Sequence, residues 1–331
     1  LTYDDVLLVP QYSDIKSRSE VSLTTEFGRG VELGLPIIAS PMDTVSEADM
    51  AGSLGELGGI SIVHRYNSIE EQSAMIASIG ENTLVGAAVG VSGDFEERAI
   101  SAVEAGAKVI CIDVAHGHHI LMKKAIKKIR EVLPNIHIMA GNVATLEGFN
   151  DLADWGADSI RCNIGGGSIC TTRVQTGHGV PGLETIFQCA KSDRNAKIIA
   201  DGGIKNSGDI VKALAAGADA VMLGSLLAGT DCSPGTIFKT ESGELRKTYR
   251  GMASAAAQKD WRGRVASCEG VSSSVPYRGK LADVVKELER GIRSGLSYSG
   301  ARSVKELQAK AQWLQQSNAS TTESSAHIRL R

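Results

Sequence analysis

Three consecutive glycines precede a cysteine in residues 163–173, whose sequence is Asn-Ile-Gly-Gly-Gly-Ser-Ile-Cys-Thr-Thr-Arg. Glycine lets a backbone turn sharply and approach a ligand closely, so this loop can present the thiol of Cys170 beside the hydroxyl of Thr172. A cysteine attacks an electrophilic carbon as its thiolate. The stretch therefore predicts a presented nucleophile, although a single cysteine is more often a buried packing residue.

Such a nucleophile needs partners. Backbone N–H groups of the glycine loop, His116 and His118 are candidates for stabilising the thiolate, although a histidine at a strand end is more often structural. An attacked carbon also needs a proton donor for its leaving group. Thr172 lies two residues after Cys170, and Glu269 lies in a long segment near the C-terminus. We expect these two side chains to share that task.

Two glycine-containing turns indicate a phosphate site. Asp201-Gly202-Gly203 and Gly224-Ser225 each follow a short apolar run. Backbone N–H groups at such turns commonly bind phosphate in β/α barrels, and Ser168 offers a further donor. The carboxylate of Asp201 is placed to accept from a ribose diol. Glycines at these turns also occur for packing alone, but the combination favours a phosphorylated small molecule.

These candidates lie at the ends of repeated βα units, which predicts a (β/α)8 TIM barrel with its chemistry on the loops after the strands. The runs are apolar throughout, as in strands buried on both faces. A doubly wound sheet is the alternative, but no Gly-x-Gly-x-x-Gly follows the first strand. The expected strands are 35–39, 59–63, 84–89, 109–113, 136–140, 159–162, 198–200 and 220–223, with helices at 95–105, 120–132, 146–155, 183–192 and 207–216.

After the eighth strand the pattern changes. Residues 230–278 contain two candidate hairpin strands, at 235–239 and 245–249, and we expect this C-terminal insertion to form a mobile flap over the barrel rim. Helices are expected at 281–294 and 304–315. We predict a single catalytic domain over 1–316, followed by a disordered tail over 317–331.

Composition excludes several function classes. The 331 residues carry a net charge of −3 without a polybasic stretch, so we expect no nucleic-acid partner. No apolar run reaches the roughly 18 residues that span a bilayer, and residues 1–6 lack the features of a secretory signal. The six cysteines include no Cys-x-x-Cys pair, which argues against a zinc site or disulfide framework and favours the cytoplasm.

Several motifs resemble one family, the IMP dehydrogenase/GMP reductase family, from about Thr2 to about Gln308. They are Gly-Gly-Gly-Ser-Ile-Cys-Thr-Thr-Arg (165–173), Ser-Pro-Met-Asp-Thr-Val (40–45), Ala-Gly-Asn-Val (140–143), Ala-Asp-Gly-Gly (200–203), Met-Leu-Gly-Ser (222–225) and Tyr-Arg-Gly-Met (249–252). The resemblance implies a β/α barrel and a homotetramer. Many dehydrogenases of the family carry two CBS modules near the position of residues 70–83, and this insert is missing here.

The resemblance also implies a shared first intermediate, in which the cysteine bonds to C2 of the purine. The dehydrogenase converts IMP and NAD to XMP, and an Arg-Tyr pair on its flap activates the hydrolytic water. The reductase instead expels ammonia from GMP and adds a hydride from NADPH, which gives IMP. The flap therefore distinguishes the two activities.

Here residues 253–270 are short, lack an Arg-Tyr pair and end in Glu269-Gly270, which favours a GMP reductase. The alternative is an IMP dehydrogenase of compact, CBS-less type that uses NAD, with Trp261-Arg262 as a reversed substitute for the pair. Residues 40–45, 249–252 and 228–235 are closer to typical dehydrogenases. A third alternative is a nucleotide-binding barrel without catalysis.

Position by position, the resemblance implies Cys170 as nucleophile, Thr172 and Glu269 as proton donors, and Asp113 with Asn142 on the nicotinamide side. A monovalent cation such as K⁺ is implied at the carbonyls of Gly165, Gly167 and Cys170. Residues 177–182, Gly-His-Gly-Val-Pro-Gly, depart from the family pattern beside the cofactor. The residues implied to hold the purine mononucleotide are Ser40, Ser168, Asp201, Gly202, Gly203, Gly224, Ser225, Gly251 and Met252.

Overall fold

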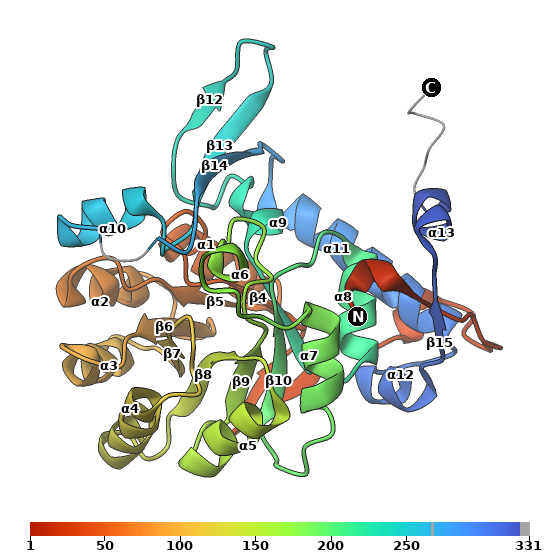
Figure 1. The fold of residues 1–331 in the computed structure, drawn as a ribbon, viewed down its shortest axis with the longest axis horizontal. Helices are drawn as coiled ribbons and strands as arrows, with labels where there is room; N and C mark the ends of the chain where they lie inside the picture. Colours follow the sequence, from red (N-terminus) through yellow and green to blue (C-terminus); the bar gives the residue numbers. More distant parts are fainter. Residues whose placement is uncertain (266–267, 325–331) are drawn as a thin grey trace.

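The computed structural model describes residues 1–265 and 268–324 and contains a closed barrel of eight parallel strands (Figure 1). The last barrel strand pairs with the first, in the register Met222 to Ile38, so the sheet closes on itself. This confirms the predicted (β/α)8 barrel and excludes a doubly wound sheet. The barrel strands are β4 (Ile37–Ala39), β5 (Ile60–Val63), β6 (Val85–Val89), β7 (Val109–Asp113), β8 (His137–Val143), β9 (Ser159–Cys162), β10 (Lys197–Asp201) and β11 (Ala220–Leu223).

Helices cover the outside of the barrel, and side chains at their first turns fix where they begin. Thr145 accepts from the backbone N–H of Gly148, and Asn206 accepts from that of Asp209. Between α2 and β6 only residues 78–84 intervene. The outer helices are α1 (Ala48–Glu56), α2 (Ile69–Ala77), α3 (Phe95–Glu104), α4 (Ile120–Val132), α5 (Leu146–Trp155), α7 (Gly182–Cys189), α8 (Ser207–Ala215) and α11 (Leu281–Tyr298).

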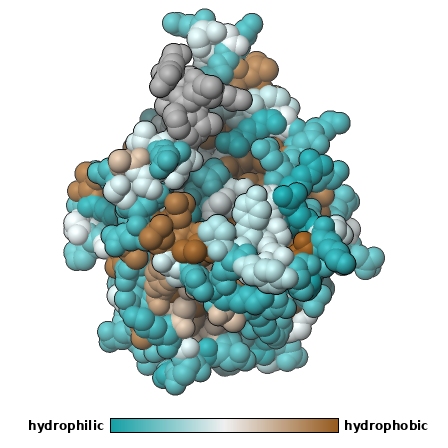
Figure 2. Space-filling model, turned by 90° about the vertical axis from the view of Figure 1, so that its right-hand side faces the viewer, coloured by the Kyte–Doolittle hydropathy of each residue, from teal (hydrophilic) through white to brown (hydrophobic). Residues whose placement is uncertain are grey.

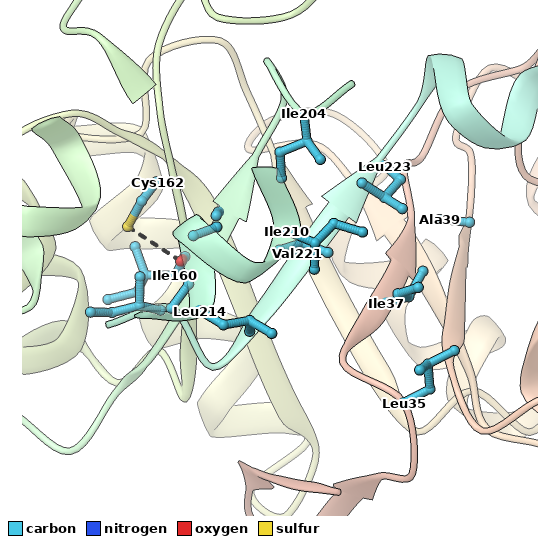
Figure 3. Close-up of a cluster of buried hydrophobic side chains, with 14 of the residues drawn as sticks. Leu35, Ile37, Ala39, Ile160, Cys162, Ile204, Ile210, Leu214, Val221 and Leu223 are labelled. Carbon is cyan, nitrogen blue, oxygen red and sulfur yellow. Dashed lines mark hydrogen bonds between the residues drawn. The ribbon is translucent and has the colours of Figure 1, made fainter. Parts of the chain in front are cut away.

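Alternate strand residues fill two separate cores. Ile37 and Ala39 belong to the large cluster between strands and helices, and Ile38 belongs to the cluster inside the barrel. Figure 3 shows part of the outer cluster, where side chains of β4, β9 and β11 lie near those of α8. A hairpin of β2 (Thr25–Gly28) and β3 (Val31–Leu33) adds Phe27 to the inner cluster. Because Phe27 stacks on His137 at the start of β8, this hairpin closes the N-terminal end of the barrel.

The segment after β11 and the short helix α9 (Ser225–Ala228) divides into two parts. A three-stranded antiparallel sheet of β12 (Ile237–Lys239), β13 (Leu245–Arg250) and β14 (Ser272–Pro276) stands away from the barrel (Figure 1). Helix α10 (Ala255–Arg262) follows β13. The predicted hairpin is therefore present, but it projects outward, and the rim is reached by the residues between β13 and β14.

Two predictions near the C-terminus differ from the structure. The helix expected over 304–315 ends earlier, as α12 (Val304–Lys310), and β15 (Trp313–Gln315) pairs with β1 (Val6–Leu8). This long-range pairing has no signal in the local sequence. In the tail expected to be disordered, α13 (Asn318–Glu323) forms. Residues 325–331 lie outside the described residues.

The face turned toward the viewer in Figure 2 is largely hydrophilic, with apolar residues in separate patches. Within 1–265 and 268–324, no helix combines the length and apolar character needed to cross a membrane.

Candidate active site

A cavity of about 520 Å³ opens where the barrel strands end, a size typical of small-molecule sites. Loops following several strands, the residues after β13 and the segment before β14 all contribute to its wall. The structure thus brings together residues that are far apart in sequence. The residues proposed from the sequence as catalytic, nucleotide-binding, cofactor-binding or cation-binding all line this cavity: Ser40, Asp113, Asn142, Gly165, Gly167, Ser168, Cys170, Thr172, Asp201, Gly202, Gly203, Gly224, Ser225, Gly251, Met252 and Glu269.

The glycine run is required by close packing within its own loop. A Cβ on Gly166 would lie 2.0 Å from Nδ2 in the side chain of Asn163, and Gly165 has a φ of +78°, which residues other than glycine rarely adopt. Arg173 holds the loop from outside, because its Nε donates to the carbonyl of Ile164 at 3.2 Å and its Nη2 to that of Val180 at 2.7 Å. The loop shape that presents Cys170 is therefore fixed by residues on both of its sides.

Cys170 begins a chain of hydrogen bonds that ends on a carboxylate. Its thiol donates to Oγ1 of Thr172 at 3.1 Å, and that hydroxyl donates to Oε2 of Glu269 at 2.8 Å. Two backbone contacts hold the segments together: the N–H of Thr171 donates to the carbonyl of Glu269, and Cys170 forms a β-bridge with Gly270. A proton leaving the thiol thus has a direct route to Glu269.

The two histidines considered as thiolate partners lie elsewhere. Neither His116 nor His118 is among the described residues that line the cavity. His118 instead pairs with Asp151, with Nε2 2.9 Å from Oδ2. Burial, followed by the nearby His118, His119 and His178, lowers the pKa of His116. A structural role therefore fits both histidines better than a role in stabilising the thiolate of Cys170.

The two glycine turns follow the neighbouring barrel strands β10 and β11, and each is closely packed against other residues of the cavity. A Cβ on Gly202 would lie 3.3 Å from the backbone of Gly167, and one on Gly224 would lie 2.6 Å from Oη of Tyr249. The hydroxyl of Ser40 is buried there without a hydrogen-bond partner among the described atoms. Such a cradle of backbone and hydroxyl donors, with one of them unsatisfied, fits a phosphate group.

Tyr249 is a cavity residue whose side chain the sequence did not single out. Burial raises its pKa to about 12, while hydrogen bonds with Ser168 and the Ser225 backbone oppose that rise. The hydroxyl therefore remains a hydrogen-bond donor at neutral pH, beside the two groups expected to hold phosphate. The only sequence signal was its place in the Tyr-Arg-Gly-Met motif.

Arg161, on β9, is the second residue that sequence reasoning missed. Its guanidinium contacts the carboxylates of both Asp113 and Asp201. Asn142, expected on the nicotinamide side, also donates to Oδ2 of Asp201 at 2.7 Å. An arginine inside an apolar strand run gives no hint of these partners, because they lie on other strands.

Among the described side chains, Trp261 and Asp260 join helix α10 to the barrel rim. The ring of Trp261 stacks on Tyr66, with centroids 5.9 Å apart and planes at 16°. Arg250 binds Asp43 on one side and Asp260 of α10 on the other, at 2.6 and 2.5 Å. Trp261 is not among the described residues lining the cavity, and the side chain of Arg262 lies outside the described atoms.

The expected monovalent-cation site consists of backbone carbonyls in the same loop. One of them, the carbonyl of Gly167, accepts the backbone N–H of Cys170 at 3.1 Å. A carbonyl oxygen has a second lone pair, so this bond leaves room for a cation. No cluster of His, Cys, Asp and Glu able to hold a metal ion occurs in the part of the chain that the structure describes.

Comparisons with known proteins all indicate the same family. The IMP dehydrogenase / GMP reductase domain matches residues 1–327. The chain is 35% identical to the inosine-5'-monophosphate dehydrogenase of Nitrosopumilus maritimus, covering 99% of this chain and 98% of the relative, and 32% identical to the GMP reductase of Leishmania major, covering 99% and 96%.

Among solved structures, GMP reductase from Trypanosoma brucei in complex with guanosine 5'-monophosphate superposes with a TM-score of 0.95 at 32% identity, covering 99% of this chain and 97% of that one. The alignment with the Nitrosopumilus maritimus relative extends over 468 positions, whereas this chain has 331 residues, so that relative carries residues absent here. Fold, cavity and sequence agree, and the chain belongs to the IMP dehydrogenase/GMP reductase family of oxidoreductases.

Proposed function

We propose that this protein is a GMP reductase, which converts GMP to IMP and ammonia with NADPH. The observation that carries the proposal is the hydrogen-bonded sequence from Cys170 through Thr172 to Glu269. It joins a nucleophile to an acid-base pair at the place where the leaving group departs.

The first step balances with the groups present. The sulfur of Cys170 bonds to C2 of the purine, and the C2–N bond of the exocyclic amine breaks. The proton lost by the thiol passes through Thr172 to Glu269 and then to the amine, which leaves as neutral ammonia. Each proton released is consumed, so the step requires no other acid or base.

The purine nucleotide and the dinucleotide occupy opposite parts of the cavity in this proposal. The turns at 201–203 and 224–225, with Ser40, Ser168, Gly251 and Met252, hold the phosphate and base of GMP. Asp113 and Asn142 face the nicotinamide, and Oδ2 of Asp113, which accepts no hydrogen bond from a described residue, fits a ribose hydroxyl. NADPH, when bound, supplies the hydride that replaces sulfur at C2. A K⁺ ion at the carbonyls of Gly165, Gly167 and Cys170 steadies the loop.

An IMP dehydrogenase of compact type is the second candidate, because dehydrogenases and reductases are similar to this chain at comparable identity. That activity needs a residue that activates water near Cys170. Trp261, the aromatic half of the reversed pair, is not among the described lining residues and stacks on the lining residue Tyr66. Glu269 bonded to Thr172 favours the reductase instead.

One paired assay distinguishes the candidates. The purified protein is incubated with GMP and NADPH, and NADPH consumption and ammonia release are followed together. The same preparation is incubated with IMP and NAD, and XMP is measured. We expect equimolar NADPH loss and ammonia release in the first reaction. XMP formation without ammonia release would establish the dehydrogenase, and GMP binding without either reaction would establish a non-catalytic barrel. Replacing NADPH by NADH in the first reaction measures cofactor preference.

We also propose that the chain acts as a homotetramer in the cytoplasm, with residues 1–316 as one catalytic domain. Light scattering coupled to gel filtration measures the assembly, and a monomeric mass under assay conditions contradicts it.

A further inference from the structure

The guanidinium of Arg161 lies between two carboxylates that belong to different strands. Its Nε and Nη2 donate to Oδ2 of Asp201, at 3.1 and 2.8 Å, and its Nη1 donates to Oδ1 of Asp113. Asp201 ends β10 and Asp113 ends β7, whereas Arg161 lies on β9. One side chain thus spans the ends of three barrel strands.

A glycine on the neighbouring strand leaves room for the side chain of Arg161. A Cβ on Gly141 of the neighbouring β8 would lie 2.6 Å from the Cβ of Arg161, so glycine at 141 leaves the arginine its space. Arg161 is only 7% exposed. A buried guanidinium is stable only when its charge and N–H groups are matched, and the two carboxylates do this together.

Each carboxylate binds Arg161 through one oxygen, and its other oxygen accepts no hydrogen bond from a described residue. Within the described residues, Oδ2 of Asp201 takes both arginine bonds and the amide of Asn142, whereas Oδ1 accepts none. Oδ1 of Asp113 takes the third arginine bond, and its Oδ2 accepts none. Both side chains line the cavity and remain 13% and 21% exposed, so ligands can reach the free oxygens.

We propose that Arg161 is a positioning residue that couples the GMP subsite to the dinucleotide subsite by orienting Asp201 and Asp113 together. The inference rests on the proposed function, in which these carboxylates receive hydroxyls from the two different ligands. Because the guanidinium is rigid and planar, rotation of one carboxylate changes the bond that the other receives. A change made on the dinucleotide side therefore alters binding on the GMP side.

A double-mutant cycle on nucleotide binding tests this coupling. The dissociation constant of GMP alone is measured by calorimetry for the wild type, Asp113→Asn, Arg161→Lys and the double variant. Lysine keeps the charge but cannot reach both carboxylates with a planar fork. We expect Asp113→Asn to change GMP affinity by about threefold or more in the wild type, and by much less in the Arg161→Lys background. Long-range effects of removing the Asp113 charge occur in both backgrounds and cancel.

Kinetics supply a second measurement. Arg161→Lys should raise the KM values for GMP and for NADPH together, by about fivefold each. Arg194→Lys is the matched control, because Arg194 also binds two carboxylates, those of Asp154 and Asp193, but on the exposed surface. It should change neither value.

The outcomes separate this inference from the proposed function. If the wild type binds no GMP, the proposed function fails and the inference fails with it. If the wild type binds and turns over GMP but Asp113→Asn has equal effects in both backgrounds, only the coupling role is wrong. If Arg161→Lys does not fold, the cycle is measured with Arg161→Gln instead, and equal effects of Asp113→Asn in the two backgrounds overturn the coupling.

Discussion

The hydroxyl of Thr172 donates to Oε2 of Glu269 at 2.8 Å, although 97 residues separate them along the chain. The same hydroxyl accepts from the thiol of Cys170 at 3.1 Å. Two segments of the chain bring Cys170, Thr172 and Glu269 together. The glycine loop after β9 presents the cysteine, and the segment before β14 delivers the carboxylate. A short path for one proton results, formed by the glycine loop and the flap.

Glu269→Gln should lower GMP turnover by about 10² to 10³ fold, because the amide cannot take the thiol proton and return it to the amine. GMP affinity should change little. Single-turnover ammonia release and calorimetric GMP binding check both statements. Glu244→Gln, an acid on the projecting hairpin, is the control and should retain wild-type turnover. Normal ammonia release by Glu269→Gln would show that another group carries the proton.

Thr172→Val keeps the shape of the side chain but removes the hydroxyl that links thiol and carboxylate. We expect a loss of turnover of about 10² fold, with recovery of most of it in Thr172→Ser, because serine restores the donor and acceptor. Mass spectrometry of the GMP-treated protein measures the covalent adduct on Cys170. Equal activity of the valine and serine variants contradicts a role for the hydroxyl.

Trp261→Ala should weaken the contact between α10 and the rim. An aromatic stack is worth about 1 kcal/mol, which corresponds to about a fivefold smaller fraction of docked flap and a similar loss in kcat/KM. Trp261→Phe should recover most of the activity. The melting temperature should change little, since Trp261 is 36% exposed. A large fall in melting temperature with unchanged kcat/KM would assign the stack to stability alone.

His137 makes stability depend on pH. Burial lowers its pKa to about 4 from 6.5, against the opposing effect of Asp158. Above pH 6.5 the histidine is neutral in both states, so it contributes nothing. As pH falls from 6.5 to 4, the unfolded chain binds a proton that the folded chain excludes. Stability therefore decreases over this window by an amount on the order of 3 kcal/mol and is constant below it.

Chemical denaturation of the wild type and His137→Gln between pH 7 and pH 4 measures this effect. The variant should be less stable at pH 7, because it loses contacts with Ser159 and Phe27. Its unfolding free energy should fall less steeply toward pH 4. Parallel slopes for the two proteins contradict the assignment to His137.

Monovalent cations should affect turnover through the glycine loop. Replacing K⁺ by Li⁺ at constant ionic strength should lower kcat by about fivefold or more, because the smaller ion cannot contact the loop carbonyls at once. Choline chloride gives the baseline without a binding cation. Equal rates in all three salts contradict a cation site at Gly165, Gly167 and Cys170.

The sequence alone determined the barrel, because its strands are continuous apolar runs and local periodicity carries that information. The predicted strand at 109–113 and helix at 120–132 coincide with β7 and α4. It also located the polar residues at strand ends, since parallel strands in a barrel place those ends on one rim. The glycine run before Cys170 was informative for a physical reason, because a Cβ at Gly166 would displace the side chain of Asn163, which donates to the carbonyl of Asp201.

Only the tertiary structure decided which of these residues meet. Arg161 lies within an apolar strand, and its two carboxylates come from strands that no local pattern connects to it. The same holds for β15, which pairs with β1 from the other end of the chain. Glu269 was predicted from a motif, but its bond to Thr172 depends on where Glu269 and Gly270 lie beside the glycine loop. Local sequence specifies strands, helices and turns, whereas contacts across the barrel arise from closure of the sheet and from packing at its rim.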